Sequence, residues 1–495
     1  MACVLGLDIG TTSTIGILIR LPDETLAIAS RPVELRSDKI GWAEEDPAQW
    51  WANVGEITRE LLHVSGVAAS DIAAIGVTGM LPAVVLLDAE GALPRPSIQQ
   101  SDARCGAEVD ELRAEVDEAA FLAKAGNGIN QQLVAAKLRW IERHEPDVFA
   151  RIATVFGSYD YINWRLTGER AIEQNWALEA GFVDLATHGI NDDLVALAHV
   201  PRAAIPRKVA SHEILGVVSA RAAAETGLAA GTPVVGGAAD MIASALGAGI
   251  VEAGDVLMKF GGSVDILTAT KHAKPDARLY LDYHLRPGLF MPNGCMSTGG
   301  SALNWFAREF AGGHAIEGLT IHQALDRLAE ARPAGADGLV ISPYFLGEKT
   351  PIHDPRARGV IDGLTLSHDV GHVWRALLES YAYAIAHHVE VLNEIGHRTE
   401  RFIVSDGGAN SRVWMQIVAD VLQRPLQRLS GHPGSCIGAA WTAAIGVDLT
   451  QDWSAISAFV RAADIVQPRR EVADVYRRGY QRYREIYRRL GPGAS

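Results

Sequence analysis

Hydrophobic and polar residues alternate in short runs at the start of the chain. The apolar residues 4–7 lead into Asp8-Ile9-Gly10-Thr11-Thr12-Ser13, and a second apolar run, residues 15–19, follows directly. This order predicts a strand, a tight turn that contains glycine, and a second strand. The turn directs backbone N–H groups and hydroxyls to one place beside a carboxylate. Such a turn can hold a phosphate, and the carboxylate of Asp8 can hold its Mg2+.

The same arrangement occurs again in the second half of the chain. Residues 255–260 predict a strand, Gly261-Gly262-Ser263 a turn, and residues 264–267 the returning strand. Lys259-Phe260-Gly261-Gly262-Ser263 thus stands where Asp8-Ile9-Gly10-Thr11-Thr12 stood in the first hairpin. Two phosphate hairpins in one chain predict two related domains that face one nucleotide.

Further strands and helices follow the first hairpin. Residues 26–33 predict a third strand, and Asp46-Pro47 before Trp50, Trp51, Val54 and Ile57 predicts a helix capped by the aspartate. Residues 72–79 and 84–87 predict buried strands, and residues 108–119 and 132–144 predict charged helices. Strands mixed with helices in this way indicate an α/β fold.

Two more junctions of strand, glycine turn and helix lie downstream. Gly236-Gly237-Ala238-Ala239-Asp240 follows one predicted strand and precedes a helix that begins near Met241. Residues 402–405 predict a strand that leads into Asp406-Gly407-Gly408-Ala409-Asn410, with an amphipathic helix behind it. A helix that starts after a glycine turn favours bound phosphate. A long helix is predicted over residues 373–392.

Composition narrows the class of protein. A chain of 495 residues exceeds what one hydrophobic core usually serves, so two domains are expected. The formal net charge is −14 and Lys and Arg form no block except near the C-terminus, which argues against a nucleic-acid partner. In that C-terminal stretch Arg and Tyr alternate at spacings of three and four, which predicts an amphipathic helix that packs its tyrosines on the body.

The four cysteines, Cys3, Cys105, Cys295 and Cys436, are scattered and form no C-x-x-C pair, so neither a disulfide framework nor a zinc site is indicated. The N-terminus carries no signal-peptide pattern, and Asp240 interrupts the apolar residues 234–250. A cytoplasmic protein without a membrane span is therefore expected.

The whole chain resembles the FGGY carbohydrate kinase family, and its pattern is most similar to the xylulose kinases of that family. The resemblance rests on residues 6–12, 42–51, 102–105, 236–240, 345–351 and 406–410. It implies two RNase H-like domains of the actin-like ATPase type around a central cleft. Residues 1–248 would form the domain that binds sugar, and residues 249–495 the domain that binds nucleotide. ATP and Mg2+ would bind between them, and a homodimer is expected.

The resemblance also implies roles for single residues. Asp240 matches the catalytic base, which accepts the proton of the attacking sugar hydroxyl, and Asp8 matches the residue that orients Mg2+. Thr11, Thr12 and Ser13 match the first phosphate turn, and Gly261, Gly262 and Ser263 the opposing one. The region around adenosine and its phosphates corresponds to Gly300, Asn304, Gly407, Gly408 and Asn410.

The sugar site departs from the xylulose kinase pattern. Expected substrate contacts are Met80, Leu81, Pro82, Gln100, Asp102 and Asp240. Leu81 and Pro82 stand where those kinases carry Met-His, and Gln100 and Ser101 stand where an aromatic residue and Asn are common. Loss of a histidine donor and an aromatic wall changes both hydrogen bonding and shape of a pocket.

The hypothesis is an ATP-dependent kinase of a small ketose or polyol, with a pentulose as the first candidate. A kinase of glycerol, erythritol or a deoxy-sugar is the alternative within the enzyme class. A non-catalytic actin-like protein that binds sugar and nucleotide is the alternative from another class. Sugar-dependent ADP release distinguishes the last of these from an enzyme.

Overall fold

The computed structural model describes residues 2–431 and 434–490. The chain divides into two units. Unit 1 contains residues 1–251, 271–291 and 433–460, and unit 2 contains residues 252–270, 292–432 and 461–495. Each holds a β-sheet with helices, so the expected mixed α/β fold with two sheet-containing parts is confirmed. The expected division into a domain of residues 1–248 and a domain of residues 249–495 stays a prediction.

The sheet of unit 1 runs in the order β13-β14-β5-β1-β2-β3, and β15 also pairs with β5. The strands are β1 (Cys3–Ile9), β2 (Ser13–Arg20), β3 (Glu24–Pro32), β5 (Ile72–Gly79), β13 (Ile214–Val217), β14 (Pro233–Val235) and β15 (Ala238–Ala239). β1 and β2 are antiparallel, as the predicted hairpin requires, whereas β5 runs parallel to β1. Thr78 of β5 pairs with Asp8 on one side and with Ala238 on the other.

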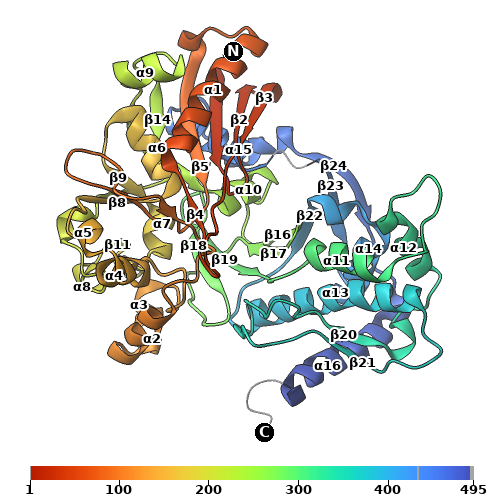
Figure 1. Ribbon diagram of the computed structural model, residues 1–495. Coiled ribbons are helices and arrows are strands. Elements are labelled where there is room, and N and C mark those ends of the chain that lie inside the picture. The colour runs from red at the N-terminus through yellow and green to blue at the C-terminus, as the bar shows by residue number, and fades with distance from the viewer. Residues whose placement is uncertain (1, 432–433, 491–495) are drawn as a thin grey trace. The chain divides into compact units, whose positions relative to one another are not determined.

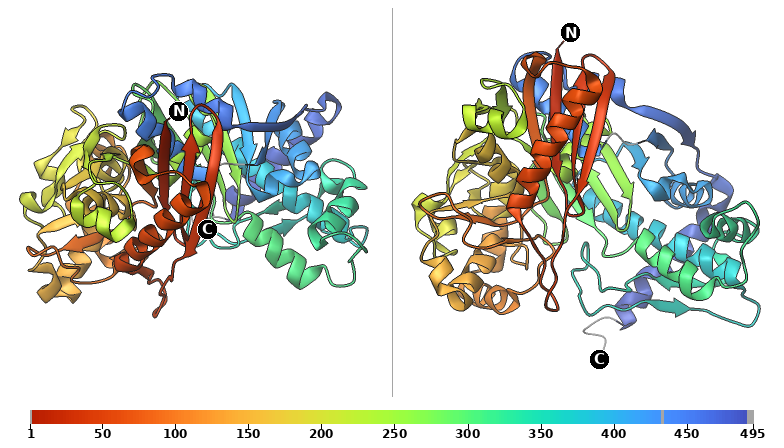
Figure 2. Two further views of the ribbon diagram at one scale, coloured as in Figure 1. Left: turned by 90° about the horizontal axis from the view of Figure 1, so that it is seen from above. Right: turned by 45° about the horizontal axis from the view of Figure 1, so that its top comes forward.

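Helix α1 (Pro47–Ser65) begins as the sequence predicts. The side chain of Asp46 accepts a hydrogen bond from the backbone N–H of Ala48 at 2.9 Å, and Gly66 ends the helix in the left-handed conformation. Trp50, Val54 and Ile57 are fully buried, since α1 contacts β2 and β3. Figure 2 shows α1 lying along these strands. The helix therefore covers one face of the N-terminal hairpin.

Helix α15 (Gly434–Gly446) packs on β1, β5 and α10 (Asp240–Gly247) with little space between the backbones. A Cβ at Gly6 would lie 2.1 Å from the carbonyl oxygen of Cys436, and a Cβ at Gly76 would lie 2.1 Å from that of Ala439. Gly6 and Gly76 are paired neighbours in the sheet. Glycine at both positions thus lets the helix rest directly on the strands.

The remaining elements of unit 1 lie outside the sheet that contains β1. They are β4 (Glu44–Glu45), β6 (Val85–Leu87), β7 (Ser97–Ile98), α2 (Gly106–Glu115), α3 (Glu118–Ala125), α4 (Val134–His144), α5 (Pro146–Phe149), β8 (Thr154–Phe156), α6 (Ser158–Thr167), β9 (Ala171–Glu173), α7 (Gln174–Glu179), β10 (Val183–Asp184), β11 (Gly189–Ile190), α8 (Asp192–Ala196), β12 (Arg207–Val209), α9 (Ala220–Thr226) and β18 (Tyr280–Tyr283). One predicted helix, over residues 108–119, is wrong in its extent. Val116 is extended, and Asp117 caps a new helix by accepting from Ala120.

The sheet of unit 2 includes the path β19-β17-β16-β22-β23-β24. Its strands are β16 (Asp255–Phe260), β17 (Val264–Thr268), β19 (Phe290–Cys295), β22 (Arg401–Ser405), β23 (Leu426–Gly431) and β24 (Arg461–Val466). The helices are α11 (Gly300–Phe310), α12 (Ile321–Glu330), α13 (Val370–Glu394), α14 (Arg412–Leu422) and α16 (Ala473–Leu490), and β20 (Val340–Ser342) pairs with β21 (Val360–Asp362). The predicted hairpin is present as β16 and β17. Helix α13 contacts both α12 and α14 (Figure 1).

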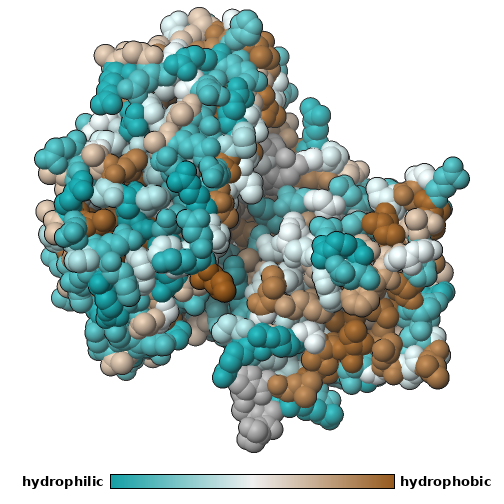
Figure 3. All heavy atoms as spheres, viewed as in Figure 1, coloured by the Kyte–Doolittle hydropathy of each residue, from teal (hydrophilic) through white to brown (hydrophobic). Residues whose placement is uncertain are grey.

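The C-terminal helix α16 packs its tyrosines inward, as its alternating pattern predicts. Tyr476 and Tyr483 are each 1% exposed, and the hydroxyls of Tyr483 and Tyr344 are 2.7 Å apart. None of the helices in the described part of the chain has the length and apolar character needed to cross a membrane. The visible face of unit 1 is mostly polar, while unit 2 shows an apolar area (Figure 3).

Candidate active site

Asp8 lies near the end of β1, and the residue is 9% exposed. The hydroxyl of Ser435, at the start of α15, donates a hydrogen bond to Asp8 Oδ2 at 2.5 Å. Burial raises the pKa of the neighbouring Cys436 thiol well above its ordinary value, and the charge of Asp8 adds to that effect. Helix α15 therefore supplies a hydroxyl that orients the carboxylate. The sequence reasoning did not find Ser435.

Asp240 is the first residue of α10 and follows β15 directly. It is half-buried, and its Oδ1 accepts a hydrogen bond from the N–H of Met241 at 2.6 Å. Both β1 and β15 are parallel neighbours of β5, so their carboxyl ends meet at one edge of the sheet. Two interstrand spacings, about 10 Å, separate β1 from β15. The structure therefore brings the elements that carry Asp8 and Asp240 to the same edge.

The turn between β1 and β2 lies at this edge as well. The N–H of Gly10 donates to the carbonyl of Ser13 at 3.1 Å, and the carbonyl of Thr12 accepts from the N–H of Val33 at 3.0 Å. Thr12 is exposed, and Thr11 and Ser13 are half-buried. These hydroxyl residues form a partly open turn beside Asp8.

Apart from Asp240, the expected sugar contacts lie in two segments, one after β5 and one after β7. Met80, Leu81 and Pro82 are buried, and the N–H of Met80 donates to the carbonyl of Ile9 at 3.2 Å. Thr11 Oγ1 lies 3.6 Å from the sulfur of Met80. The first segment therefore begins next to the β1–β2 turn.

The second segment contains Gln100 and Asp102. Gln100 is half-buried, and its side-chain oxygen lies 3.5 Å from Gln132 Nε2. Asp102 is 1% exposed and accepts from the N–H of Ala43 at 2.6 Å and from Arg104 Nη2 at 2.7 Å. The guanidinium of Arg104 lies 3.8 Å above the ring of Trp42. Asp102 thus holds the Trp42 segment through Arg104.

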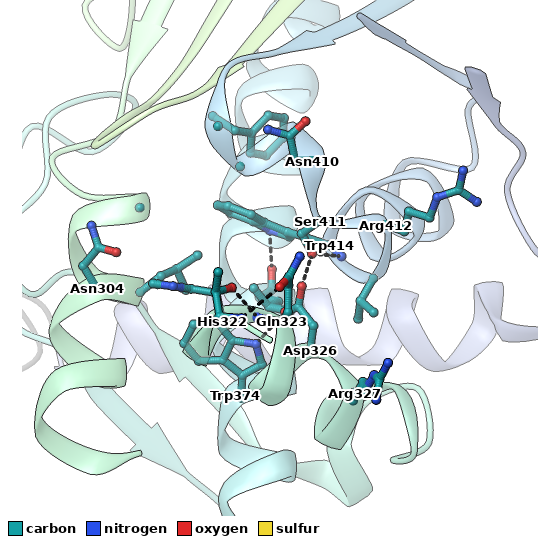
Figure 4. A pocket seen from close by; sticks show the side chains of 18 of the residues that line it. Asn304, His322, Gln323, Asp326, Arg327, Trp374, Asn410, Ser411, Arg412 and Trp414 are labelled. Carbon is teal, nitrogen blue, oxygen red and sulfur yellow. Dashed lines mark hydrogen bonds between the residues drawn. The ribbon is translucent and has the colours of Figure 1, made fainter. Parts of the chain in front are cut away.

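Unit 2 contains a cavity of about 770 Å3, shown in Figure 4. Its lining includes the residues that the resemblance to the FGGY family assigns to the nucleotide: Gly261, Gly262, Gly300, Asn304, Gly407, Gly408 and Asn410. Ser263 follows the lining glycines in the β16–β17 turn, and its hydroxyl donates to Asp265 at 3.3 Å. Glycines and asparagines from three separate stretches of the chain, residues 261–262, 300–304 and 407–410, therefore meet in one cavity.

The glycines leave open space at the cavity. A Cβ placed on Gly262 or Gly407 would meet no atom within 4 Å. A Cβ on Gly408 would lie 2.7 Å from the ring of Trp414, so glycine is required there for packing. Exposed backbone N–H groups in such turns bind phosphate oxygens. This part of the cavity is suited to the phosphates of a nucleotide.

Asp326 connects three helices that line the same cavity (Figure 4). Its Oδ1 accepts from the indole Nε1 of Trp374 at 2.8 Å, and its Oδ2 accepts from the hydroxyl of Ser411 at 2.7 Å. Burial raises the pKa of this carboxyl. Ser411 also accepts from the N–H of Trp414 and so caps α14. Sequence reasoning missed this group, because its members lie on separate helices and share no local motif.

Unit 1 thus carries a carboxylate edge, and unit 2 carries a glycine-lined cavity. The sequence profile of the FGGY family of carbohydrate kinases matches the chain over residues 3–247 for the N-terminal domain and over residues 258–447 for the C-terminal domain. The chain belongs to the FGGY family of carbohydrate kinases. It is thus a phosphotransferase that acts on an alcohol group of a sugar. Kinases of this family use ATP as the phosphate donor.

Individual relatives support the assignment to this family. The chain is 28% identical to the xylulose kinase of Bacillus subtilis (strain 168), with 98% of this chain and 97% of that protein covered. It is 30% identical to the xylulose kinase of Escherichia coli (strain K12), with 90% of each covered. The crystal structure of xylulose kinase from Rhodospirillum rubrum is 60% identical and covers 99% of both chains, with a TM-score of 0.95. The fold of the chain is therefore that of the actin-like ATPase sugar kinases, as expected.

Proposed function

We propose that this FGGY kinase transfers the γ-phosphate of ATP to a hydroxyl of a pentulose, with xylulose as the first candidate. The observation that carries the proposal is the 60% identity to the Rhodospirillum rubrum protein, which is named a xylulose kinase, over 99% of both chains. The xylulose kinases of two further bacteria match nearly the full length. Sugar specificity is a property of pocket shape, and identity at this level favours a shared pocket.

Asp240 is the proposed catalytic base. Its position at the carboxyl end of β15 leaves the side chain half-exposed at the edge where the β1–β2 turn lies. There it would accept the proton of the sugar hydroxyl as that oxygen attacks phosphorus. The N–H of Met241 holds one carboxylate oxygen and leaves the group oriented before substrate arrives.

Nucleotide binding is assigned to the cavity of unit 2, where the open glycines Gly262 and Gly407 suit the phosphates. Mg2+ prefers oxygen ligands and usually binds one or two carboxylates together with substrate phosphates. Asp8 offers such a carboxylate, with Ser435 orienting one of its oxygens. The ion, when bound, would neutralise charge on the phosphates. The residues present therefore fit both ATP and Mg2+.

The segments that carry Leu81, Pro82 and Gln100 are the proposed sugar site. Because these residues replace a Met-His pair and a more aromatic segment, another small ketose or polyol remains the second candidate. Glycerol, erythritol and a deoxy-sugar belong in the same test. The homodimer and the cytoplasmic location remain predictions from the family and the composition.

A coupled assay of ADP release over ketoses, polyols and aldoses tests the proposal. Xylulose should give the highest kcat/KM, and Asp240→Ala should abolish transfer while the affinity for ADP stays close to that of the wild type. Asp23→Ala, an exposed aspartate in the same unit, is the matched control. Binding of sugar and nucleotide without sugar-dependent ADP release would support the non-catalytic alternative, and near-normal turnover of Asp240→Ala would remove that residue from its role.

A further inference from the structure

Lys137 is a charged residue in the interior of unit 1. It lies on α4, its exposed fraction is 0%, and its ammonium donates to the carbonyl oxygen of Gln99 at 2.8 Å and to that of Pro82 at 3.3 Å. Burial lowers the pKa of Lys137 to about 8. Removing an ammonium from water costs several kcal/mol, and an apolar side chain of similar size avoids that cost. The charged group therefore requires a function other than filling space.

The two carbonyls belong to the two segments of the proposed sugar site. Pro82 follows Leu81, and Gln99 precedes Gln100. The segments are also paired through Val84 and Ile98, whose backbone groups exchange hydrogen bonds at 2.9 and 3.1 Å. Lys137 thus joins them a second time, next to the residues expected to touch the sugar.

The first segment is held by a series of buried donors. The hydroxyl of Ser158 donates to the carbonyl of Met80 at 2.8 Å, Lys137 to that of Pro82, and the indole of Trp176 to that of Ala83 at 2.8 Å. Ser158 and Trp176 are both fully buried. Side-chain donors to three carbonyls of one short segment fix the path of a backbone that has no regular ladder of its own.

We infer that Lys137 is a positioning residue for the sugar, which sets the distance between the Leu81–Pro82 segment and the Gln100 segment. The inference rests on the proposed function, since the role of these segments is part of that proposal. Lys137 touches backbone carbonyls and acts on substrate only through them. Its loss should therefore weaken sugar binding and leave nucleotide binding in unit 2 unchanged.

The charged and titratable groups around Lys137 are Asp102, Arg104 and Cys105. Asp102 is paired with Arg104, and burial raises the pKa of the Cys105 thiol to about 11, so the thiol is neutral at physiological pH. Lys137 is therefore expected to titrate near pH 8. As pH rises through that value, its bonds to the two carbonyls lose the charge that strengthens them.

Lys137→Met tests the inference by steady-state kinetics with both substrates. The KM for the sugar should rise by about 10-fold or more, because two hydrogen bonds from a charged donor are lost, while the KM for ATP should stay within about 2-fold. Lys124→Met is the control, since Lys124 lies on the surface of the same unit near Asp193. As pH rises, the kcat/KM of the wild type for the sugar should fall with an apparent pKa near 8. Lys137→Met should not show this fall.

Two further measurements keep the inference falsifiable if Lys137→Met does not fold. The wild-type pH profile needs no variant, and Ser158→Ala removes the donor to the Met80 carbonyl by a small change that should raise the sugar KM in the same direction. An unchanged sugar KM in Lys137→Met, or equal changes in both KM values, would overturn the inference. A wild-type kcat/KM for the sugar that does not change with pH, together with a wild-type sugar KM in Ser158→Ala, would also overturn it. Absence of sugar-dependent turnover in the wild type would instead overturn the proposed function, and this inference with it.

Discussion

Gly438→Ala places a methyl group where α15 rests on α10. An ideal Cβ at this position would lie 2.0 Å from the carbonyl oxygen of Ala243, 2.7 Å from its carbonyl carbon and 2.9 Å from its Cα. All three are backbone atoms, so no side chain can rotate away. Ordinary contact between carbon atoms needs about 3.5 Å, and the helices must separate by about 1 Å to restore it.

The displacement should affect both stability and rate. Overpacking of this kind costs about 1–3 kcal/mol of the free energy of unfolding. Asp240 is the first residue of α10, so a shift of the helix moves the proposed base. A misplacement of about 1 Å can lower a rate about 100-fold. We expect kcat to fall by about that factor, with a smaller change in the affinity for ADP, because the nucleotide cavity lies in unit 2.

The assay is ADP release at saturating sugar and ATP, with thermal unfolding measured on the same preparation. Gly106→Ala is the matched control, because a Cβ at Gly106 meets no atom within 4 Å and the residue begins α2 in the same unit. It should leave both kcat and the melting temperature near those of the wild type. A folded Gly438→Ala with wild-type kcat would refute the reasoning, as would an equal loss in Gly106→Ala.

Two further predictions concern buried carboxyls. Asp326→Ala leaves the indole of Trp374 and the hydroxyl of Ser411 without their acceptor, so the Kd for ADP should rise about 10-fold while the sugar KM stays constant. Calorimetric titration measures this, and an unchanged Kd would contradict it. Burial raises the pKa of Glu173 from 4.5 to about 7. Between these two pH values the folded state holds a proton that the unfolded state has lost. The free energy of unfolding should therefore fall by up to about 3 kcal/mol as pH rises from 4.5 to about 7. Glu173→Gln should flatten this fall in thermal melts between pH 5 and 8, and parallel slopes in variant and wild type would contradict it.

Local signals predicted much of the fold. Asp46 and Pro47 marked the start of α1, and the turns at Gly10 and Gly261 marked both hairpins, because caps and tight turns depend on a few neighbouring residues. The single helix expected over residues 108–119 was wrong in its extent. Apolar residues occur on both sides of Val116, but the backbone at Val116 is extended and ends the first helix. Asp117 carried the signal for a second start, and its cap could have been read from the sequence.

Contacts between distant segments could not be predicted in this way. Ser435 reaches Asp8 from 427 positions away, and Lys137 reaches Pro82 from 55. Neither residue type is unusual in its local setting, since a lysine on a helix is ordinarily solvated and a serine near a helix start ordinarily caps it. The candidate site residues Asp8 and Asp240 could be named from the family motifs, whereas the contacts of Ser435 and Lys137 required the structure.

Unit 1 is assembled from segments that are made at very different times. Strands β1 and β5 are complete once residue 79 has been synthesised, but α15, the helix that rests on Gly6 and Gly76, ends at residue 446. At about 5–20 residues per second the nascent chain carries this apolar strand surface without its covering helix for roughly 20 to 70 s. The speed of translation thus sets how long this apolar surface of the nascent domain stays open to aggregation.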